Sequence, residues 1–325
     1  MHGTADIDRS HFAPLPRPTN AAGEERRTGV EIEFAGLTED EAAHLAAEVL
    51  GGEVERAGPR ERRVTGSVIG ELKVYLDTAY RDWHGRLAEA GLDLARSLVP
   101  VEIVTEPLLH DDLPALETLR EALREAGAEG SQAAALYGFG LHLNPEIPGE
   151  TVEDLAPVVT AYGLLEDWLR YEDPIDTSRR ILPFSDPWPR PFVDALAQAE
   201  GWSLADLTAS YLEHSATRNR GLDMLPVLSH VDRARVAEGL GGSLGAVKPR
   251  PAFHYRLPDS RVNASGWRIA YEWNRWVTVE RLAARPDLLD ELKARWRAHR
   301  RDVFSTIADW RRFTGNVVAS QGLAP

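Results

Sequence analysis

The sequence predicts an α+β fold, and three observations lead to this expectation. Short runs rich in β-branched residues alternate apolar and polar side chains at period two, which is typical of half-buried strands. Segments with helical periodicity lie among these runs without the regular alternation of a doubly wound sheet. The second half of the chain is richer in helical segments than the first.

The first expected strand covers residues 29–34, with the sequence Gly-Val-Glu-Ile-Glu-Phe. Val30, Ile32 and Phe34 would share one face of this strand, while Glu31 and Glu33 would share the other. A strand face with two carboxylates is unusually acidic. The glutamates therefore need a partner that compensates their desolvation, and a hard divalent cation is the simplest candidate.

In the first half of the chain, N-cap residues, glycines and the alternation of apolar and polar side chains predict the next helices and strands. Thr38 is a suitable N-cap with Glu41 at the capping-box position, so a helix is expected from 39 to the glycine pair at 51 and 52. The further expected elements are a meander of strands at 53–57, 62–68 and 71–77, a helix at 83–97, a strand at 100–105, a helix at 113–127 and a strand at 137–143.

In the second half, helices are expected at 151–170, 191–199 and 203–214, a strand at 252–257, and helices at 267–284 and 287–313. The proline-rich segment 173–191 is too long for a simple connection, and it is interpreted as either a lid or a packed surface excursion. The arginine-rich end of the last helix leaves open whether it forms a contact in a homo-oligomer or covers an acidic substrate.

Composition limits the function classes. The net charge is −14, which makes a nucleic-acid partner unexpected. Cysteine is absent, so thiolate metal sites and cysteine nucleophiles are excluded. The sequence contains neither a signal-peptide core nor a run long enough for a membrane span, which predicts a cytoplasmic protein. Lysine occurs only at 73, 248 and 293 beside many arginines, as is typical of a GC-rich bacterial genome.

The chain divides into two parts at about residue 28. Residues 1–28 contain Pro14, Pro16 and Pro18 with mixed charges, and they are expected to form a disordered or loosely docked arm. The remaining 29–325 are long enough for a large core, and we interpret them as a single catalytic domain with C-terminal helices from about 267.

Three expected strands carry polar side chains that suit metal binding. Glu31 and Glu33 share a strand face, Glu102 lies in the strand at 100–105, and His142 and Asn144 share a face of the third strand. This coincidence predicts a cleft with a sheet as its floor. The alternative for each strand taken alone is the ordinary solvent face of an antiparallel sheet.

These motifs resemble the amidoligase family, a distant branch of the carboxylate-amine ligases that include glutamine synthetase and glutamate-cysteine ligase. The resemblance rests on four segments within about 28–285, namely Gly-Val-Glu-Ile-Glu-Phe at 29–34, Asp77-Thr78-Ala79, Glu102-Ile103-Val104-Thr105 and His142-Leu143-Asn144. It implies a glutamine-synthetase-like antiparallel sheet funnel with flanking helices. It also implies an ATP-dependent ligase that joins a small-molecule or peptide carboxylate to an amine through an acyl phosphate, with Mg²⁺ or Mn²⁺.

The resemblance also assigns roles to single residues. Asp77 would ligate a metal or position the amine, and Arg256 would contact phosphoryl oxygens, as arginine forks do. Asn144, Lys248 and Arg220 are further candidates for the nucleotide, with Arg250, Arg179, Arg180 and Arg218 below them. The expected metal ligands are Glu31, Glu33, Glu102, His142 and His254.

His254 is a departure from the family pattern. The corresponding strand in the relatives carries Glu-x-Arg, and here the glutamate is replaced by His254 while Arg256 is kept. Either His254 takes the metal position or the site holds one metal fewer. Two other function classes therefore stay open: a metal-dependent hydrolase of amide bonds, and a non-catalytic binding protein whose metal site has decayed.

Overall fold

The computed structural model describes residues 7–76, 99–133, 138–176, 179 and 185–325. Within these residues, eight strands form one antiparallel sheet in the order β2-β3-β4-β5-β1-β6-β8-β7. The strands are β1 (Thr28–Phe34), β2 (Glu53–Gly58), β3 (Glu61–Ser67), β4 (Gly70–Leu76), β5 (Val101–Thr105), β6 (Leu141–Pro145), β7 (Leu222–Asp223) and β8 (His254–Tyr255). The predicted α+β class is confirmed, while the relationship to glutamine synthetase stays a prediction.

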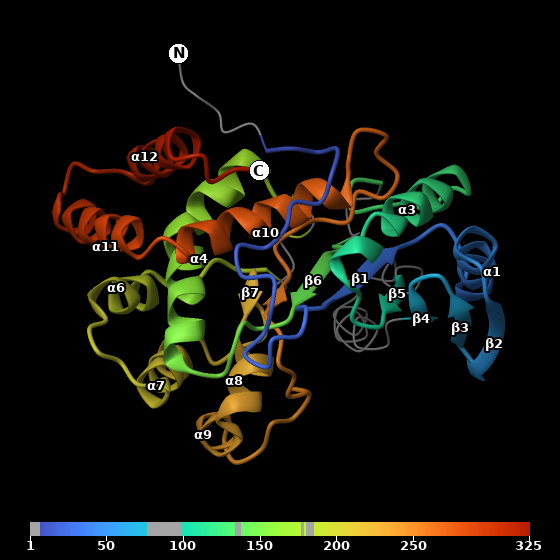
Figure 1. The fold of residues 1–325 in the computed structure, drawn as a ribbon, viewed down its shortest axis with the longest axis horizontal. Coiled ribbons are helices and arrows are strands. Elements are labelled where there is room, and N and C mark those ends of the chain that lie inside the picture. The colour runs from blue at the N-terminus through green and yellow to red at the C-terminus, as the bar shows by residue number, and fades with distance from the viewer. Residues whose placement is uncertain (1–6, 77–98, 134–137, 177–178, 180–184) are drawn as a thin grey trace, which may run out of the picture.

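The helices flank this sheet (Figure 1). They are α1 (Glu39–Leu50), α3 (Ala115–Glu125), α4 (Val152–Glu172), α6 (Arg190–Gln198), α7 (Leu204–Ser215), α8 (Leu225–Val231), α9 (Arg233–Gly239), α10 (Ile269–Ala283), α11 (Pro286–Arg301) and α12 (Ile307–Ser320). The predicted start of α1 is confirmed, because Thr38 and Glu41 form a capping box. No helix in the described part of the chain is long and apolar enough to cross a membrane.

The two faces of the sheet differ in chemistry. Val74, Ile103, Ile32 and Leu141 lie opposite one another on β4, β5, β1 and β6, and all four are fully buried. Further along this apolar face, the ring of Tyr255 on β8 contacts Trp276 of α10. Since side chains alternate along a strand, the intervening residues project from the other face, which carries the polar side chains.

The N-terminal arm differs from the disordered or loosely docked segment that its composition suggested. Phe12 and Leu15 are buried, and the segment that begins at residue 7 crosses α10 before it reaches β1 (Figure 1). Trp273 Nε1 donates to the Ala13 carbonyl at 2.7 Å, and the Ala13 N–H donates to Asn274 Oδ1 at 2.9 Å. The arm is therefore part of the folded core, because the helix offers partners for its backbone that the local sequence does not reveal.

The helix expected at 287–313 is wrong in its extent. The chain forms two helices there, since α11 ends at Arg301 and α12 begins at Ile307. Thr306 and Asp309 form a capping box at the start of α12. This cap was a local signal that the overall helical periodicity obscured.

Two other expectations are altered. The strand expected at 252–257 shortens to β8, His254–Tyr255, with its neighbours held by isolated bridges. The described ends of the 173–191 segment are anchored: the Asp176 N–H donates to Asp259 Oδ2 at 2.7 Å and Trp188 Nε1 donates to the Leu222 carbonyl at 2.9 Å. The helix expected at 83–97 lies outside the described residues.

Candidate metal centre

The central strands bring the predicted ligands together through their register. Glu31 of β1 lies opposite His142 of β6, and Glu33 of β1 lies opposite Glu102 of β5. Directly opposed residues of an antiparallel pair project from the same face, so these four side chains meet on the polar face. His254 of β8 joins them from the far side of β6.

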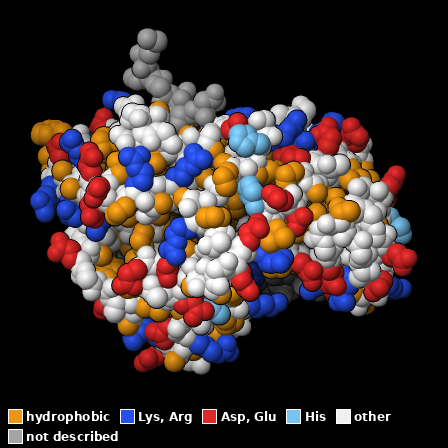
Figure 2. Space-filling view, viewed as in Figure 1, with side chains coloured by type: hydrophobic (Ala, Val, Ile, Leu, Met, Phe, Trp, Pro, Cys, Tyr) orange, Lys and Arg blue, Asp and Glu red, His pale blue; other side chains and the backbone are white. Residues whose placement is uncertain are grey.

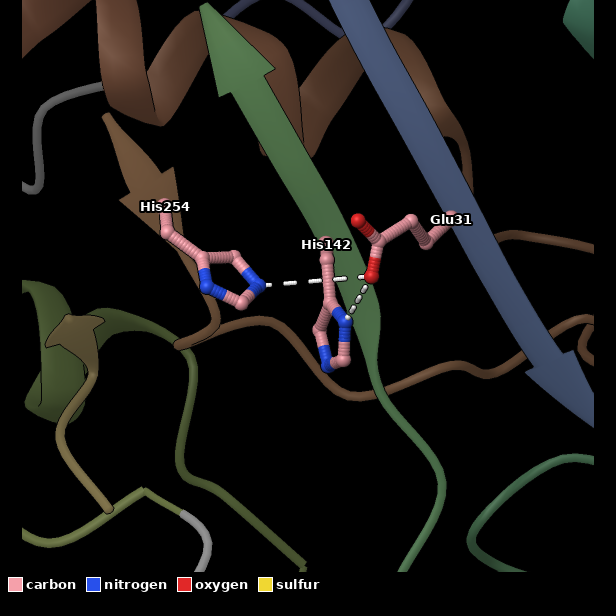
Figure 3. Close-up of side chains that lie close together, drawn as sticks. All are labelled: Glu31, His142 and His254. Atoms are coloured by element: carbon pink, nitrogen blue, oxygen red, sulfur yellow. Dashed lines mark hydrogen bonds and ion pairs between the residues drawn. The ribbon is translucent and has the colours of Figure 1, made fainter. Parts of the chain in front are cut away.

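Glu31, His142 and His254 form the first of two overlapping groups. His142 Nδ1 lies 2.9 Å from Glu31 Oε2, and His254 Nε2 lies 4.0 Å from the same oxygen. Both imidazole rings point toward this carboxylate (Figure 3). One donor atom from each residue lies within 4.8 Å of the others, a spacing that a single cation can bridge.

Glu33, Glu102 and His142 form the second group, with the same spacing limit of 4.8 Å. His142 Nε2 lies 3.8 Å from Glu33 Oε1, so the two ring nitrogens of His142 face different carboxylates. The Gly140 N–H donates to Glu33 Oε2 at 2.7 Å and fixes the orientation of that carboxylate. All three ligands are buried.

The protonation states suit cation binding. Burial would raise the pKa of Glu31, but the hydrogen bond and charge of His142, with the charges of His254 and Arg250, hold it well below its usual value. Burial lowers the pKa of His254 to about 4, against the opposing effect of Asp223. Near neutral pH the centre therefore presents a carboxylate and a neutral imidazole, which are the forms that bind metal.

The donor set fits a divalent metal ion. Within the described residues, the buried Nε2 of His254 makes no hydrogen bond and only approaches Glu31 Oε2 at 4.0 Å, although polar atoms in such a position normally have a partner. The three carboxylates of the two groups, Glu31, Glu33 and Glu102, carry like charges, and a cation between them would lower their mutual repulsion. A donor set that combines carboxylate oxygens with imidazole nitrogens is typical of first-row transition metals, whereas Mg²⁺ is bound mainly by oxygen ligands.

Asp223 belongs to the site and was missed by the sequence reasoning. It is fully buried, and its Oδ2 lies 3.5 Å from His254 Nδ1. The Leu225 N–H donates to its Oδ1 at 3.0 Å and Arg218 Nε donates to its Oδ2 at 3.1 Å. A carboxylate behind a metal-binding histidine orients the ring, and an acid within the apolar run Leu222-Asp223-Met224-Leu225 was the available signal.

We expect Asp223→Asn to weaken Mn²⁺ binding by about 10- to 100-fold. The new amide can donate to Nδ1 of His254, which would move the ring proton to the nitrogen that must bind the metal. Isothermal titration calorimetry with Mn²⁺ measures this, with the exposed Asp290→Asn as the matched control. Equal affinity of the two variants would contradict the orienting role.

Gly140 makes room for the His142 ring. A methyl group at this position would lie 2.8 Å from His142 Nε2 and 3.0 Å from Arg179 Nη2. We expect Gly140→Ala to lower the free energy of unfolding by about 1–3 kcal/mol and to weaken Mn²⁺ binding, because the ring must move. Urea unfolding and calorimetry test this. Gly266→Ala is the control, since nothing lies within 4 Å of its new methyl group.

Two of the remaining candidates, Asn144 and Arg256, interact with residues of the centre. Asn144 Nδ2 donates to Glu31 Oε1 at 2.9 Å and so helps to orient a ligand. Arg256 donates to the Arg218 carbonyl at 2.7 Å, and burial lowers its pKa against the opposing charges of Asp223 and Glu33. The Arg256 guanidinium therefore lies close enough to the centre to interact electrostatically with the carboxylates of Asp223 and Glu33.

Of the other candidates, Arg220 makes hydrogen bonds elsewhere, Lys248 lies at the surface, and two cannot be placed. Arg220 donates to Ser215 Oγ and to the Pro187 carbonyl, both at 2.8 Å, so it anchors the end of the proline-rich segment. Lys248 is exposed. Asp77 and Arg180 lie outside the described residues.

Comparison with known proteins identifies a family. The family model described as "Putative amidoligase enzyme" matches residues 24–278, a range that contains every strand of the sheet and all five predicted metal ligands. No curated protein and no solved structure gives a significant match to the chain. Because the family model covers more than half of the sequence, the chain belongs to the amidoligase family.

Proposed function

We propose that the protein is an ATP-dependent ligase that joins a carboxylic acid to an amine through an acyl phosphate, with Mg²⁺ or Mn²⁺. The observation that carries this proposal is the convergence of three carboxylates and two imidazoles on one buried patch of the sheet. The family membership supports an enzyme of the ligase type. Amide formation from a free acid requires activation, because a carboxylate is a poor acyl donor.

The reaction has two steps. An oxygen of the substrate carboxylate attacks the γ-phosphorus of ATP, ADP leaves, and an acyl phosphate forms. The amine nitrogen then attacks the acyl carbon, inorganic phosphate leaves, and the nitrogen loses a proton. A divalent cation supplies neutralising charge for the phosphoryl oxygens when bound.

The chain's own residues hold and orient the reactants. Glu31, Glu33, Glu102, His142 and His254 are the proposed metal ligands, in the two overlapping groups. Arg256 is the proposed contact for phosphoryl oxygens, since its fork keeps its charge in a buried position. Asp77 stays the predicted residue for ligating a metal or positioning the amine.

A single-turnover assay with hydroxylamine tests the proposal. The protein is mixed with ATP, Mg²⁺ and a pool of small carboxylic acids, and hydroxylamine traps any acyl phosphate as a hydroxamate. We expect ADP and hydroxamate to form together with the wild-type protein and neither to form with Glu102→Gln. If the wild-type protein forms neither product, the proposed activity is wrong.

A metal-dependent amide hydrolase is the second candidate, because one carboxylate and two imidazoles in the first group form a donor set that catalytic zinc sites also use. A hydrolase would activate water and would not need a nucleotide. A non-hydrolysable ATP analogue with Mg²⁺ should raise the melting temperature of a ligase by binding its folded state. A hydrolase would show stabilisation by Zn²⁺ alone, and a decayed binding protein would respond to neither.

A further inference from the structure

A cavity of about 350 Å³ adjoins the candidate metal centre. Glu31 and Asn144 contribute to its lining, so Glu31 belongs both to the cavity and to the first metal group. The rest of the lining is largely apolar with three charged side chains, and it includes Val104, Pro107, Pro251, Ala252, Arg27, Glu146 and Arg250. Cavities of this size and character commonly bind small molecules.

Arg250 connects this cavity to the metal centre. Its Nη1 lies 3.3 Å from Glu31 Oε1, whereas Glu31 Oε2 faces the two histidines. This is the one hydrogen bond of the Arg250 side chain within the described residues, and that side chain is 35% exposed. A cation on Glu31 would compete with Arg250 for the carboxylate and leave the guanidinium available to an anion in the cavity.

The charges of the lining limit which anion fits. Arg27 and Arg250 are offset by Glu31 and Glu146, so the cavity holds little net positive charge for a triphosphate. A single carboxylate needs only one guanidinium, and the apolar side chains suit a short hydrocarbon body. The lining therefore favours the acid substrate over ATP.

We propose that this cavity binds the acid substrate of the ligase, a small monocarboxylic acid with a short apolar body. Its carboxylate pairs with Arg250 beside Glu31, where the metal centre can reach it, and its body packs against Val104, Pro107 and Ala252. This inference rests on the proposed function, because it takes the metal centre to be the place where the acid is activated.

Saturation-transfer NMR in Mg²⁺ tests the cavity directly. The probes are butyrate, valerate, hexanoate and phenylacetate, each paired with its primary amide. We expect the wild-type protein to give signals with the acids and not with the amides. Val104→Trp would fill the cavity and abolish these signals, whereas Val68→Trp, at a position 74% exposed in the turn between β3 and β4, would keep them.

Two further variants complete the test. One fills the cavity from a different segment, in case Val104→Trp does not fold, and the other identifies the side chain that binds the carboxylate. Ala252→Phe should also abolish the signals by filling the cavity from another segment. Arg250→Gln should remove the preference for acids over amides. The proposal is overturned if no acid binds, or if acid binding survives both cavity-filling variants.

The failure of this proposal can be told from the failure of the proposed function. Calorimetry with Mn²⁺ on the wild-type protein, in the absence of any acid, reports the metal centre independently of the cavity. Mn²⁺ binding without acid binding overturns the cavity assignment alone. Acid binding without Mn²⁺ binding supports the cavity as an acid site and contradicts the metal-dependent ligase.

Discussion

Glu31→Gln is expected to reduce Mn²⁺ affinity by about 100-fold or more, at least as much as the loss of a residue that only orients a ligand. Glu31 is the carboxylate that both His142 and His254 approach, and its other oxygen accepts hydrogen bonds from Asn144 and Arg250. A neutral amide cannot replace that charge at the junction of four side chains. We expect this variant to form less hydroxamate as well, because it binds less metal.

The measurement for Glu31→Gln is calorimetry with Mn²⁺, together with thermal unfolding with and without the metal. We expect Mn²⁺ to raise the melting temperature of the wild-type protein, because a ligand that binds only the folded state stabilises it. The melting temperature of the variant should not change with Mn²⁺. Glu53→Gln, an exposed change on β2, is the matched control and should behave as the wild type. An unchanged affinity in Glu31→Gln would remove Glu31 from the centre.

Arg26→Met is expected to lower the free energy of unfolding by about 3–5 kcal/mol. Arg26 and Glu280 form a bidentate pair with both N···O distances at 2.7 Å, and their side chains are 0% and 3% exposed. This pair joins the N-terminal arm to α10. Removing the guanidinium would leave the Glu280 carboxylate buried without its cation, which is the costly case for an ion pair.

The double variant Arg26→Met/Glu280→Gln separates the pair from the packing of the arm. We expect it to recover part of the lost stability, because the remaining amide carries no charge and can still accept the Trp276 Nε1 hydrogen bond now made to Glu280 Oε1 at 2.8 Å. Urea unfolding of the single and double variants measures the coupling. Wild-type stability in Arg26→Met would mean that the arm is loosely docked after all.

Local sequence signals predicted much of the fold because they act over a few residues. The capping box at Thr38 and Glu41 located α1, and the alternation of Val30, Ile32 and Phe34 located β1. The same reasoning missed the break between α11 and α12, where a capping box interrupts a segment that is helical on both sides. It also missed the docking of the arm, since Ala13 finds its partners on α10.

Sequence alone determined which faces of three strands would be acidic or polar, because side-chain direction in a strand depends only on its period of two. It could not determine that Glu31 lies opposite His142 or that Asp223 lies behind His254, since register and strand order are decided by packing across the whole chain. The cavity beside Glu31 likewise depends on Arg250, more than 200 residues away in sequence. The donor types were thus inherent in the sequence, whereas their meeting in one centre is a consequence of the tertiary structure.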